Sequence, residues 1–493
     1  MPLNKTIIAL SLLTLFACSK KTNEPVEIPK LILGPLPGIY ISYDSQSNTF
    51  RLGNEFIERR LMLNSDNNFL YTFAFINKLS GRNYIKSPDR EISFSLGDKE
   101  ISGLSGDLEY VSHEITGTAG IKMLELEFKI TIKEKGILNL SVFYQIFQGF
   151  PVIKKWIEIK NPTGSGIAIK NIKTEYIKMS IGLQNQIYNR YTSFIFDFLA
   201  NEYTGEEIAI GNETPGILKE NLITANGFIS VGIKSRNKGF EIPPGQKLVF
   251  PASLIFILSS DNKDIISSFL EYYLPAYERK DLSIWYEDIS PGIDMQNLQK
   301  KMTLAAESGA KTFCLKGKWA NKRGDWSTES NLEISSQYVH SIGLKLGVAV
   351  DIAVADVGSQ ALEVNTDQKV EVGDESNISI PDNGKLMCLA SSYASYVSYE
   401  LDSMVKNYGI DYLRFTGSII PNGDFTGCSA SKHIHYNPAD SIWYIYQGLF
   451  TICDYLHRQN PDLIIQVHPE SYNPINGVDL ALLYYTDLKL ILD

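Results

Sequence analysis

The feature that most constrains the fold is a change of rhythm in the hydrophobic pattern near residue 280. Before it, apolar and polar residues alternate with period two in runs such as 124–132, 138–146 and 152–159, which Gly, Asn and Pro separate. Successive side chains of a strand point to opposite faces, so this pattern predicts antiparallel strands with one buried and one solvated face. After residue 280, short apolar runs alternate with segments of helical spacing. This second pattern predicts parallel strands joined by crossover helices.

The two patterns divide the chain of 493 residues. We predict a lipoprotein signal peptide over residues 1–18, a tether over 19–36, an antiparallel β-sandwich domain over 37–270 and an α/β domain over 271–493. In the α/β region, strands are expected near 283–289, 312–315, 344–350, 410–415, 463–467 and 488–492, and helices near 295–310, 332–341, 393–408 and 442–458, with a short helix after 477. A closed (β/α)₈ barrel has eight strands in about 250 residues. The sequence therefore predicts an incomplete TIM-type barrel of about six strands, C-terminally truncated by about two βα units.

The charge balance argues against one class of partner. The chain has 46 basic and 56 acidic residues, a formal net charge of −10, and no long block of Lys and Arg. Nucleic-acid phosphates require a positive footprint, so we predict no nucleic-acid partner. Hydrophobic residues at 44% and charged residues at 21% are ordinary for a globular protein, which excludes disorder as the main state.

The first residues have the pattern of a targeting segment. Lys5 precedes an apolar run over residues 7–16, which is too short to span a bilayer as a helix, and Ala17 stands directly before Cys18. The segment 15–18 resembles a bacterial lipobox, in which the cysteine is lipidated. We predict a location in the bacterial cell envelope, lipid-anchored at the outer membrane, with the periplasmic or surface-facing side left open and the lipid as the only membrane contact. The alternative is an ordinary signal peptide with a chance cysteine.

The remaining cysteines and two histidines were considered as metal ligands. The cysteines show no CxxC spacing, so the sequence predicts buried thiols and neither a disulfide framework nor a zinc site. His433 and His435 have the spacing of a metal pair but no evident third ligand, and loop hydrogen bonding is favoured over metal binding. We therefore predict no metal and no cofactor. The cysteines concerned are Cys314, Cys388, Cys428 and Cys453.

Several segments, in their order and spacing, carry a resemblance to a known family. They are residues 149–156 (GFPVIKKW), 285–288 (WYED), 313–319 (FCLKGKW), 324–326 (GDW), 408–416 (YGIDYLRFT) and 477–493. Together they resemble glycoside hydrolase family 36, the α-galactosidase-like family with an N-terminal β-supersandwich and a (β/α)₈ barrel. The resemblance covers about residues 37–493. It implies hydrolysis of terminal α-linked sugars and an oligosaccharide or glycan as the partner.

The sequence departs from the family pattern at the substrate-binding and catalytic positions. The family binds sugar hydroxyls with the carboxylates of a DDGW motif, but Lys316 and Gly317 stand at those positions. The nucleophilic Asp that closes the KWD motif is replaced by Thr416, and Arg414 stands two residues before it. The position that resembles the acid/base residue is Asp493. The resemblance therefore implies an impaired enzyme.

Three residues remain as catalytic candidates. Retaining glycosidases need two carboxyl groups about 5–5.5 Å apart, and a Thr416 hydroxyl without an adjacent base is a poor substitute for one of them. Strand parity places Asp411 on the opposite face from Thr416, so it offers no rescue. Glu470, just past the fifth strand, is a better candidate, and Asp493 is the other. A solvated loop carboxylate and an exposed terminal residue are the respective alternatives.

The candidate substrate-binding residues have structural alternatives of their own. The tryptophans could stack on a sugar or pack in the core, and Asp325 could accept hydroxyl hydrogen bonds or cap a turn. Lys316 and Arg414 favour an anionic sugar such as a uronic acid, unless one of them neutralises a barrel carboxylate. The residues are Trp319, Asp325, Trp326, Arg414 and Lys316, with Trp285 more typical of the core.

Three functions stay open from the sequence. The first is an α-galactosidase-like hydrolase whose carboxylates have been relocated. The second is a non-catalytic surface lipoprotein that binds glycan in the same pocket. The third is an inactive gene fragment, because a barrel that lacks two strands has unpaired edges.

Overall fold

The structure is a computed structural model. By internal contacts the chain divides into residues 1–33 and 34–493, and the description below concerns the second unit. The predicted signal peptide, Cys18, the whole tether, the strand near 488–492 and Asp493 lie outside the described residues. Those described are 38–180, 186–188, 195–201, 203–224, 226–235, 238–259, 264–275, 283–289, 294–326, 330–373, 378, 383–421, 425–473 and 477–487.

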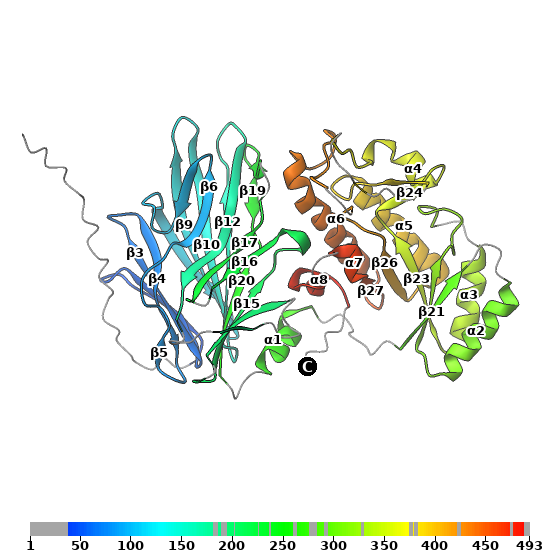
Figure 1. The fold of residues 1–493 in the computed structure, drawn as a ribbon, viewed down its shortest axis with the longest axis horizontal. Helices are drawn as coiled ribbons and strands as arrows, with labels where there is room; N and C mark the ends of the chain where they lie inside the picture. Colours follow the sequence, from blue (N-terminus) through cyan, green and yellow to red (C-terminus); the bar gives the residue numbers. More distant parts are fainter. Residues whose placement is uncertain are drawn as a thin grey trace, which may run out of the picture. The chain divides into compact units, whose positions relative to one another are not determined.

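The first part of the chain folds into antiparallel sheets, as the alternating pattern predicts (Figure 1). One sheet has the order β1 (Tyr40–Asp44), β2 (Thr49–Gly53), β3 (Ile57–Asn64), β4 (Phe69–Asn77) and β5 (Arg82–Asn83). The largest runs β13 (Gln186–Tyr188), β14 (Phe196–Asn201), β15 (Glu206–Asn212), β20 (Ser253–Leu258), β11 (Val152–Lys160), β10 (Gly136–Phe147), β9 (Ile121–Ile132) and β8 (Glu109–Gly117), and β19 (Lys247–Val249) also pairs with β11. The third runs β16 (Lys219–Ile223), β17 (Phe228–Ile233), β12 (Ile167–Lys178), β6 (Glu91–Leu96) and β7 (Lys99–Ser102), with β18 (Phe240–Ile242) on β12.

The prediction of one solvated face is wrong for the middle of the largest sheet. Every residue of β15 and β20 is buried. Their second face packs in an apolar cluster with α1 (Ile265–Tyr273) and α8 (Leu480–Tyr485). In this cluster the ring of Phe256 contacts that of Phe269, and Leu480 is also a member. Because both faces of these strands are covered, residues 208–210 of β15 and 254–258 of β20 are continuously apolar rather than alternating.

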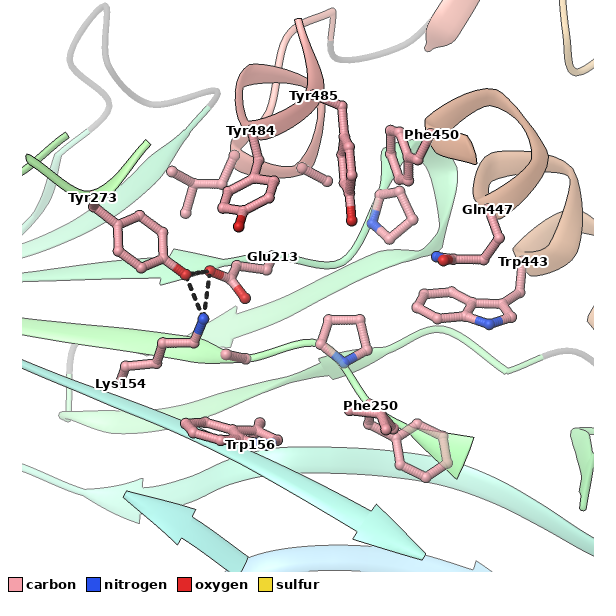
Figure 2. Close-up of a pocket in the computed structure, with 16 residues that line it drawn as sticks. Lys154, Trp156, Glu213, Phe250, Tyr273, Trp443, Gln447, Phe450, Tyr484 and Tyr485 are labelled. Atoms are coloured by element: carbon pink, nitrogen blue, oxygen red, sulfur yellow. Dashed lines mark hydrogen bonds and ion pairs between the residues drawn. The ribbon is translucent and has the colours of Figure 1, made fainter. Parts of the chain in front are cut away.

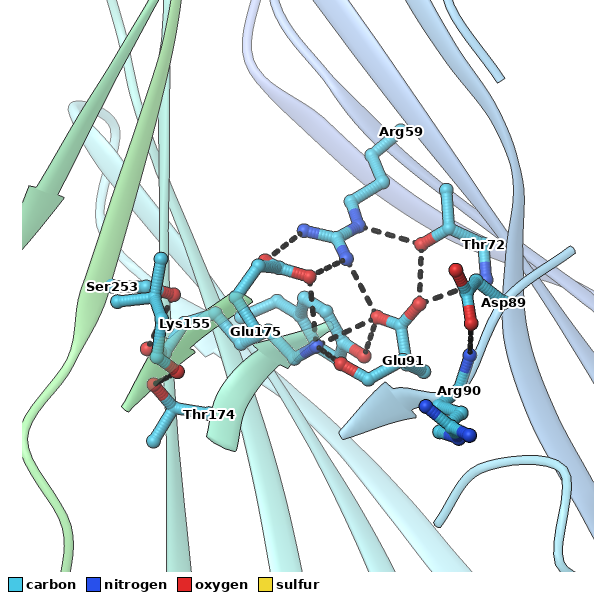
Figure 3. A network of polar contacts seen from close by, with 11 residues as sticks. Arg59, Thr72, Asp89, Arg90, Glu91, Lys155, Thr174, Glu175 and Ser253 are labelled. Carbon is cyan, nitrogen blue, oxygen red and sulfur yellow. Dashed lines mark hydrogen bonds and ion pairs between the residues drawn. The ribbon is translucent and has the colours of Figure 1, made fainter. Parts of the chain in front are cut away.

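The sandwich interior also holds a cluster of four charged side chains (Figure 3). Arg59 donates to Glu175 at 2.8 Å and to Glu91 at 2.6 Å, and Lys155 donates to Glu91 at 2.9 Å and to Glu175 at 3.2 Å. None of these side chains is more than 1% exposed. Two cations and two carboxylates cancel, so the interior carries no net charge at this point. Lys155 belongs to the GFPVIKKW segment.

The second part is a parallel sheet with helices, so the predicted fold class is confirmed (Figure 1). Each neighbouring pair is parallel, and the strands follow one another in sequence order. The strands among the described residues are β21 (Ile284–Ile289), β22 (Thr312–Gly317), β23 (Lys345–Asp351), β26 (Tyr412–Thr416) and β27 (Ile464–Val467). The longer helices between them are α2 (Met295–Glu307), α3 (Ser330–Ser341), α5 (Tyr393–Tyr408) and α6 (Pro438–Gln459).

Local sequence signals account for the helix ends. The helix α5 ends where Gly409 adopts φ +60°, a left-handed conformation that favours glycine. The helix α6 begins at Pro438, earlier than the apolar spacing predicts, because Asn437 and Asp440 form a capping box around its first turn. No helix of the described residues is long and apolar enough to cross a membrane.

Several short elements are not predicted from the sequence. They are β24 (Val354–Asp356), which pairs antiparallel with β25 (Gly384–Leu386), the helices α4 (Gln360–Val364) and α7 (Pro469–Tyr472), and the 3₁₀ turns η2 (Gly216–Leu218) and η4 (Thr366–Gln368). Except for η2 and α7, they lie between β23 and α5 in the chain. This insertion and the segment between β26 and α6 both follow the carboxyl ends of sheet strands.

Candidate functional site

A cavity of about 320 Å³ lies where β22, β23 and β26 end. The carboxyl ends of parallel strands are the usual place for active sites in α/β folds, because the loops that follow them are free to vary. Its lining residues are Lys316, Gly317, Trp319, Ala320, Lys322, Arg323, Trp326, Ala349, Val350, Asp351 and Thr416.

Thr416, the last residue of β26, lines this cavity and pairs in register with Asp351 of β23. The structure has the arrangement that strand parity predicts. Tyr412, on the face of Thr416, donates to Gln466 at 2.8 Å, whereas Asp411 faces the helices and bonds His340 of α3 at 2.8 Å. Thr416 therefore stands on the strand face that turns away from the helices.

Asp351 is a carboxyl group at the cavity that the sequence analysis missed. Burial raises the pKa of Asp351 to about 6, against the opposing effects of a backbone hydrogen bond from Ala353 and the charge of Arg323. A carboxylic acid with such a pKa is suited to exchange a proton near neutral pH. The signal in the sequence is weak, because Asp351 follows a buried strand without any motif that marks it.

The backbone of Gly417 lies close to the Asp351 carboxylate, and only a residue without a Cβ fits there. Its φ is +76°, and a Cβ atom at this position would stand 2.3 Å from Oδ2 of Asp351. Only glycine adopts this conformation without strain and also leaves the space. The residue after Thr416 thus keeps room for the Asp351 carboxylate.

The cationic side chains at the cavity have partners. Lys316 pairs with Asp288 of β21 at 2.7 Å, and Arg323 binds Asp356 of β24 through two donors at 2.9 and 2.6 Å. Lys322 donates to the carbonyl of Gly358 at 2.6 Å. Neutralisation of a barrel carboxylate, one of the alternatives for Lys316, is therefore present in the structure.

The two tryptophans both pack in the core and line the cavity. Trp319 is 9% exposed and donates its indole N–H to the carbonyl of Ala349 at 2.6 Å, and Trp326 is 3% exposed. Core packing and sugar stacking are therefore not exclusive at these positions. Trp285 is partly buried against the core and does not line the cavity.

Other predicted site residues lie elsewhere. The Asp325 carboxylate accepts the backbone N–H of Gln360, the first residue of α4, at 2.7 Å, which is the turn-capping alternative. Arg414 stacks its guanidinium over the ring of Tyr286 at 4.5 Å and is not among the lining residues. Glu470 is exposed in α7 directly after β27 and does not line the cavity.

A larger cavity of about 470 Å³ lies between sandwich strands and the helices α6 and α8 (Figure 2). Trp156, Trp443, Tyr484 and other aromatic side chains line it. Its polar cluster consists of Lys154, Glu213 and Tyr273, in which Lys154 lies 3.2 Å from the Glu213 carboxylate and Tyr273 donates to the same oxygen. It shares no lining residue with the first cavity and holds none of the strand-end residues discussed above.

Comparison with known proteins defines the class of fold. No protein-family model and no curated protein matches the sequence. Solved structures do match, and they show that the chain has the fold of the α-galactosidases of glycoside hydrolase family 36. The predicted resemblance is therefore confirmed at the level of the fold, a glycosidase-type fold with a β-sandwich and an α/β part.

Particular structures support this at low sequence identity. The family 36 α-galactosidase AgaB from Geobacillus stearothermophilus matches with a TM-score of 0.68 and 14% identity, over 91% of this chain and 74% of that chain. The α-galactosidase from Lactobacillus brevis matches with a TM-score of 0.66 and 14% identity, over 90% of this chain and 73% of that one. The galactosidase domain of the α-galactosidase-sucrose kinase AgaSK matches with a TM-score of 0.68 and 13% identity, over 91% and 74%.

Proposed function

We propose that the protein binds the terminal α-linked sugar of an oligosaccharide in the cavity beside Thr416. In this proposal it is an α-galactosidase-like protein whose hydrolysis is impaired. The volume of about 320 Å³ falls within the range of small-molecule sites. Variants of the structurally similar AgaA from Geobacillus stearothermophilus have been solved in complex with stachyose and with raffinose, which supports an oligosaccharide ligand.

The impairment is inferred from the residue at the end of β26, Thr416. Retaining hydrolysis uses one carboxylate to attack the anomeric carbon and a carboxyl group to protonate the leaving oxygen, about 5–5.5 Å apart. The end of β26 offers the hydroxyl of Thr416, which is a weak nucleophile at its ordinary pKa. Among the described residues that line the cavity, Asp351 alone carries a carboxyl group.

The remaining lining residues are suited to bind a sugar. The ring faces of Trp319 and Trp326 offer apolar surface to the C–H face of a pyranose. Lys316 and Arg323 are donors without acceptor capacity, so they favour hydroxyl oxygens or the carboxylate of an anionic sugar. Asp351 accepts hydroxyl hydrogen bonds when it is ionised.

A second candidate function is a working hydrolase with a relocated acid. The observation in its favour is the pKa of Asp351, which burial raises to about 6, the range of a general acid. In this mechanism Asp351 protonates the leaving oxygen. The nucleophile, or the base that activates water, must be a carboxylate from outside the described lining, and the candidates are Glu470 and Asp493.

The decisive experiment measures binding and hydrolysis on the same protein. We expect saturable binding of raffinose or stachyose by calorimetry and no measurable hydrolysis of an aryl α-galactoside. Thr416→Asp should hydrolyse this substrate at a rate at least about 100-fold above the detection limit, because it restores a carboxylate at the strand end. Thr131→Asp, at an exposed position of β9, is the matched control and should change nothing.

The outcomes separate the two candidates. Hydrolysis by the unmodified protein that is lost in Asp351→Asn supports the relocated hydrolase and contradicts the impairment. Absence of binding by neutral and anionic α-linked sugars alike refutes the sugar site. If Thr416→Asp binds sugar and stays inactive, the missing nucleophile is not the cause of the impairment.

We further propose that Cys18 is lipidated and anchors the protein in the cell envelope, at the outer membrane. The lipobox-like segment 15–18 supports this. When expressed in a bacterial host, the protein with Cys18 intact should partition into the detergent phase in a detergent phase-separation assay and should incorporate labelled palmitate. The Cys18→Ser variant should do neither. Equal partitioning of both forms would show that no lipid is attached at this cysteine.

A further inference from the structure

Four side chains that bind metals meet between two loops of the α/β part. They are Cys388, Cys428, His433 and His435, and one ligand atom of each lies within 4.8 Å of those of all the others. Cys388 follows β25 and precedes α5, whereas the other three lie between β26 and α6. All four residues are buried. No sequence motif marks this group, because the two cysteines are 40 residues apart and only the fold brings them to the histidines.

The separations match one coordination geometry. The Sγ of Cys428 lies 3.4 Å from Nδ1 of His433, and Nε2 of His435 lies 3.3 Å from the same Nδ1. With Zn–S about 2.3 Å and Zn–N about 2.0–2.1 Å, a tetrahedron separates sulfur from nitrogen by about 3.5 Å and nitrogen from nitrogen by about 3.3 Å. The two measured distances are those of neighbouring ligands on one tetrahedral ion.

The surrounding groups orient these ligands. The Nε2 of His433 lies 3.1 Å from the carbonyl oxygen of Asp367, to which it can only donate. Its Nδ1 is then the nitrogen with the free lone pair, and it faces Cys428 and His435. The backbone N–H of Glu371 donates to the Cys428 sulfur at 3.4 Å, a contact that stabilises a thiolate. Metal-binding histidines typically donate their second ring N–H to a carbonyl in this way.

We propose that Cys388, Cys428, His433 and His435 bind one Zn²⁺ ion in a closed tetrahedral site. Both thiols lose their protons to the solvent when the ion binds, and both histidines bind as neutral rings. Two thiolates balance the charge of Zn²⁺, so the buried centre is neutral. Four protein ligands leave no open position for water or substrate, which is typical of structural zinc.

The site would hold together the loops that follow the two strands beside the candidate sugar cavity. Backbone hydrogen bonds already join these loops, from Ser429 N–H to the Glu371 carbonyl at 2.8 Å and from Ile434 N–H to the Ala390 carbonyl at 3.1 Å. The loop of Cys388 comes after β23, which ends at Asp351, and the loop of Cys428 comes after β26, which ends at Thr416. The ion would cross-link the two segments in the folded state.

The first test is the metal content of the full-length protein, purified under reducing conditions without chelator and measured by mass spectrometry. We expect about one zinc per chain, and less than about 0.1 in Cys428→Ser and in His435→Gln. Cys453→Ser, at a buried cysteine of α6 outside the group, is the matched control and should keep its zinc.

The second test does not depend on a variant that folds. Removal of zinc from the unmodified protein with a chelator, followed by Co²⁺, should produce the visible absorption of tetrahedral cobalt with thiolate ligands. Removal should also lower the melting temperature, and added zinc should restore it.

Three results would overturn the proposal. The first is unmodified protein that stays without zinc after dialysis against it. The second is zinc that persists in both ligand variants. The third is a disulfide between Cys388 and Cys428 in protein isolated from its native compartment. None of these readouts involves sugar, so the zinc proposal and the sugar site can fail separately.

Discussion

The buried charge cluster of the sandwich allows a sharp prediction for Lys155→Met. The Lys155 ammonium donates to the Glu91 carboxylate at 2.9 Å, to the Glu175 carboxylate at 3.2 Å and to the Glu91 carbonyl at 2.6 Å. Without it, two buried carboxylates share the single charge of Arg59. A carboxylate left without a partner in the interior costs about 3–5 kcal/mol, so we expect the free energy of unfolding to fall by this amount.

The titration of Glu91 gives the direction of the pH dependence. Burial acts to raise the pKa of Glu91, but the charges of Arg59 and Lys155 outweigh it and lower the pKa to about 2 from an ordinary 4.5. Because the pKa is lower in the folded state, this stabilisation is complete above about pH 4.5 and is lost as the pH falls toward 2. Lys155→Met should therefore begin to unfold at a higher pH than the unmodified protein.

Guanidinium unfolding at pH 7, followed by circular dichroism, measures the effect, and hydrogen exchange of β6 and β11 assigns the transition to the sandwich. Lys129→Met, at an exposed position of β9, is the control and should cost less than about 0.5 kcal/mol. The double variant Lys155→Met/Glu175→Gln removes one charge of each sign and should recover at least half of the loss. The reasoning is refuted if Lys155→Met costs no more than the control, or if the double variant is no more stable than the single one.

Two further predictions concern the cavity. Gly417→Ala should lower the free energy of unfolding by about 1–3 kcal/mol and weaken sugar binding, because its Cβ would stand 2.3 Å from the Asp351 carboxylate at a φ of +76°. Scanning calorimetry measures the stability and titration calorimetry the binding. The control is Gly164→Ala, where a Cβ meets nothing within 4 Å, and it should change neither quantity. Burial raises the pKa of Asp351 to about 6 from 3.8, so its contribution to stability is present below about pH 4 and is lost as the pH rises through about 6. Asp351→Asn should therefore gain stability relative to the original protein between pH 4 and pH 8, by up to about 3 kcal/mol in the free energy of unfolding. A loss of relative stability over the same pH range would contradict the assignment.

Local patterns predicted three long strands of the sandwich and the main strands and helices of the α/β part. The alternating runs 124–132, 138–146 and 152–159 lie within β9, β10 and β11, and the helix expected over 393–408 is α5, residue for residue. These elements are decided by side-chain periodicity and by end signals such as Gly409, which act over a few residues and are therefore readable in one dimension.

The order and spacing of the motifs predicted the fold, although the overall sequence identity to the similar structures is low. Structures at 12–14% identity share the architecture, since burial of the right faces survives wide changes of side chain. The segment 408–416 also predicted that Thr416 lies at the end of a strand, where the structure has it as the last residue of β26. What the fold alone could not decide is the activity, which depends on single side chains at that strand end.

Tertiary structure decided which distant residues meet. The double burial of β15 and β20, the carboxyl group of Asp351 beside Thr416, and the approach of Cys388 to His433 all depend on contacts between segments far apart in the chain. Periodicity specifies which face of an element is buried and leaves open what covers it. For that reason the sequence by itself determined the main strands and helices, and only their packing determined the cavity and the group of four buried ligands.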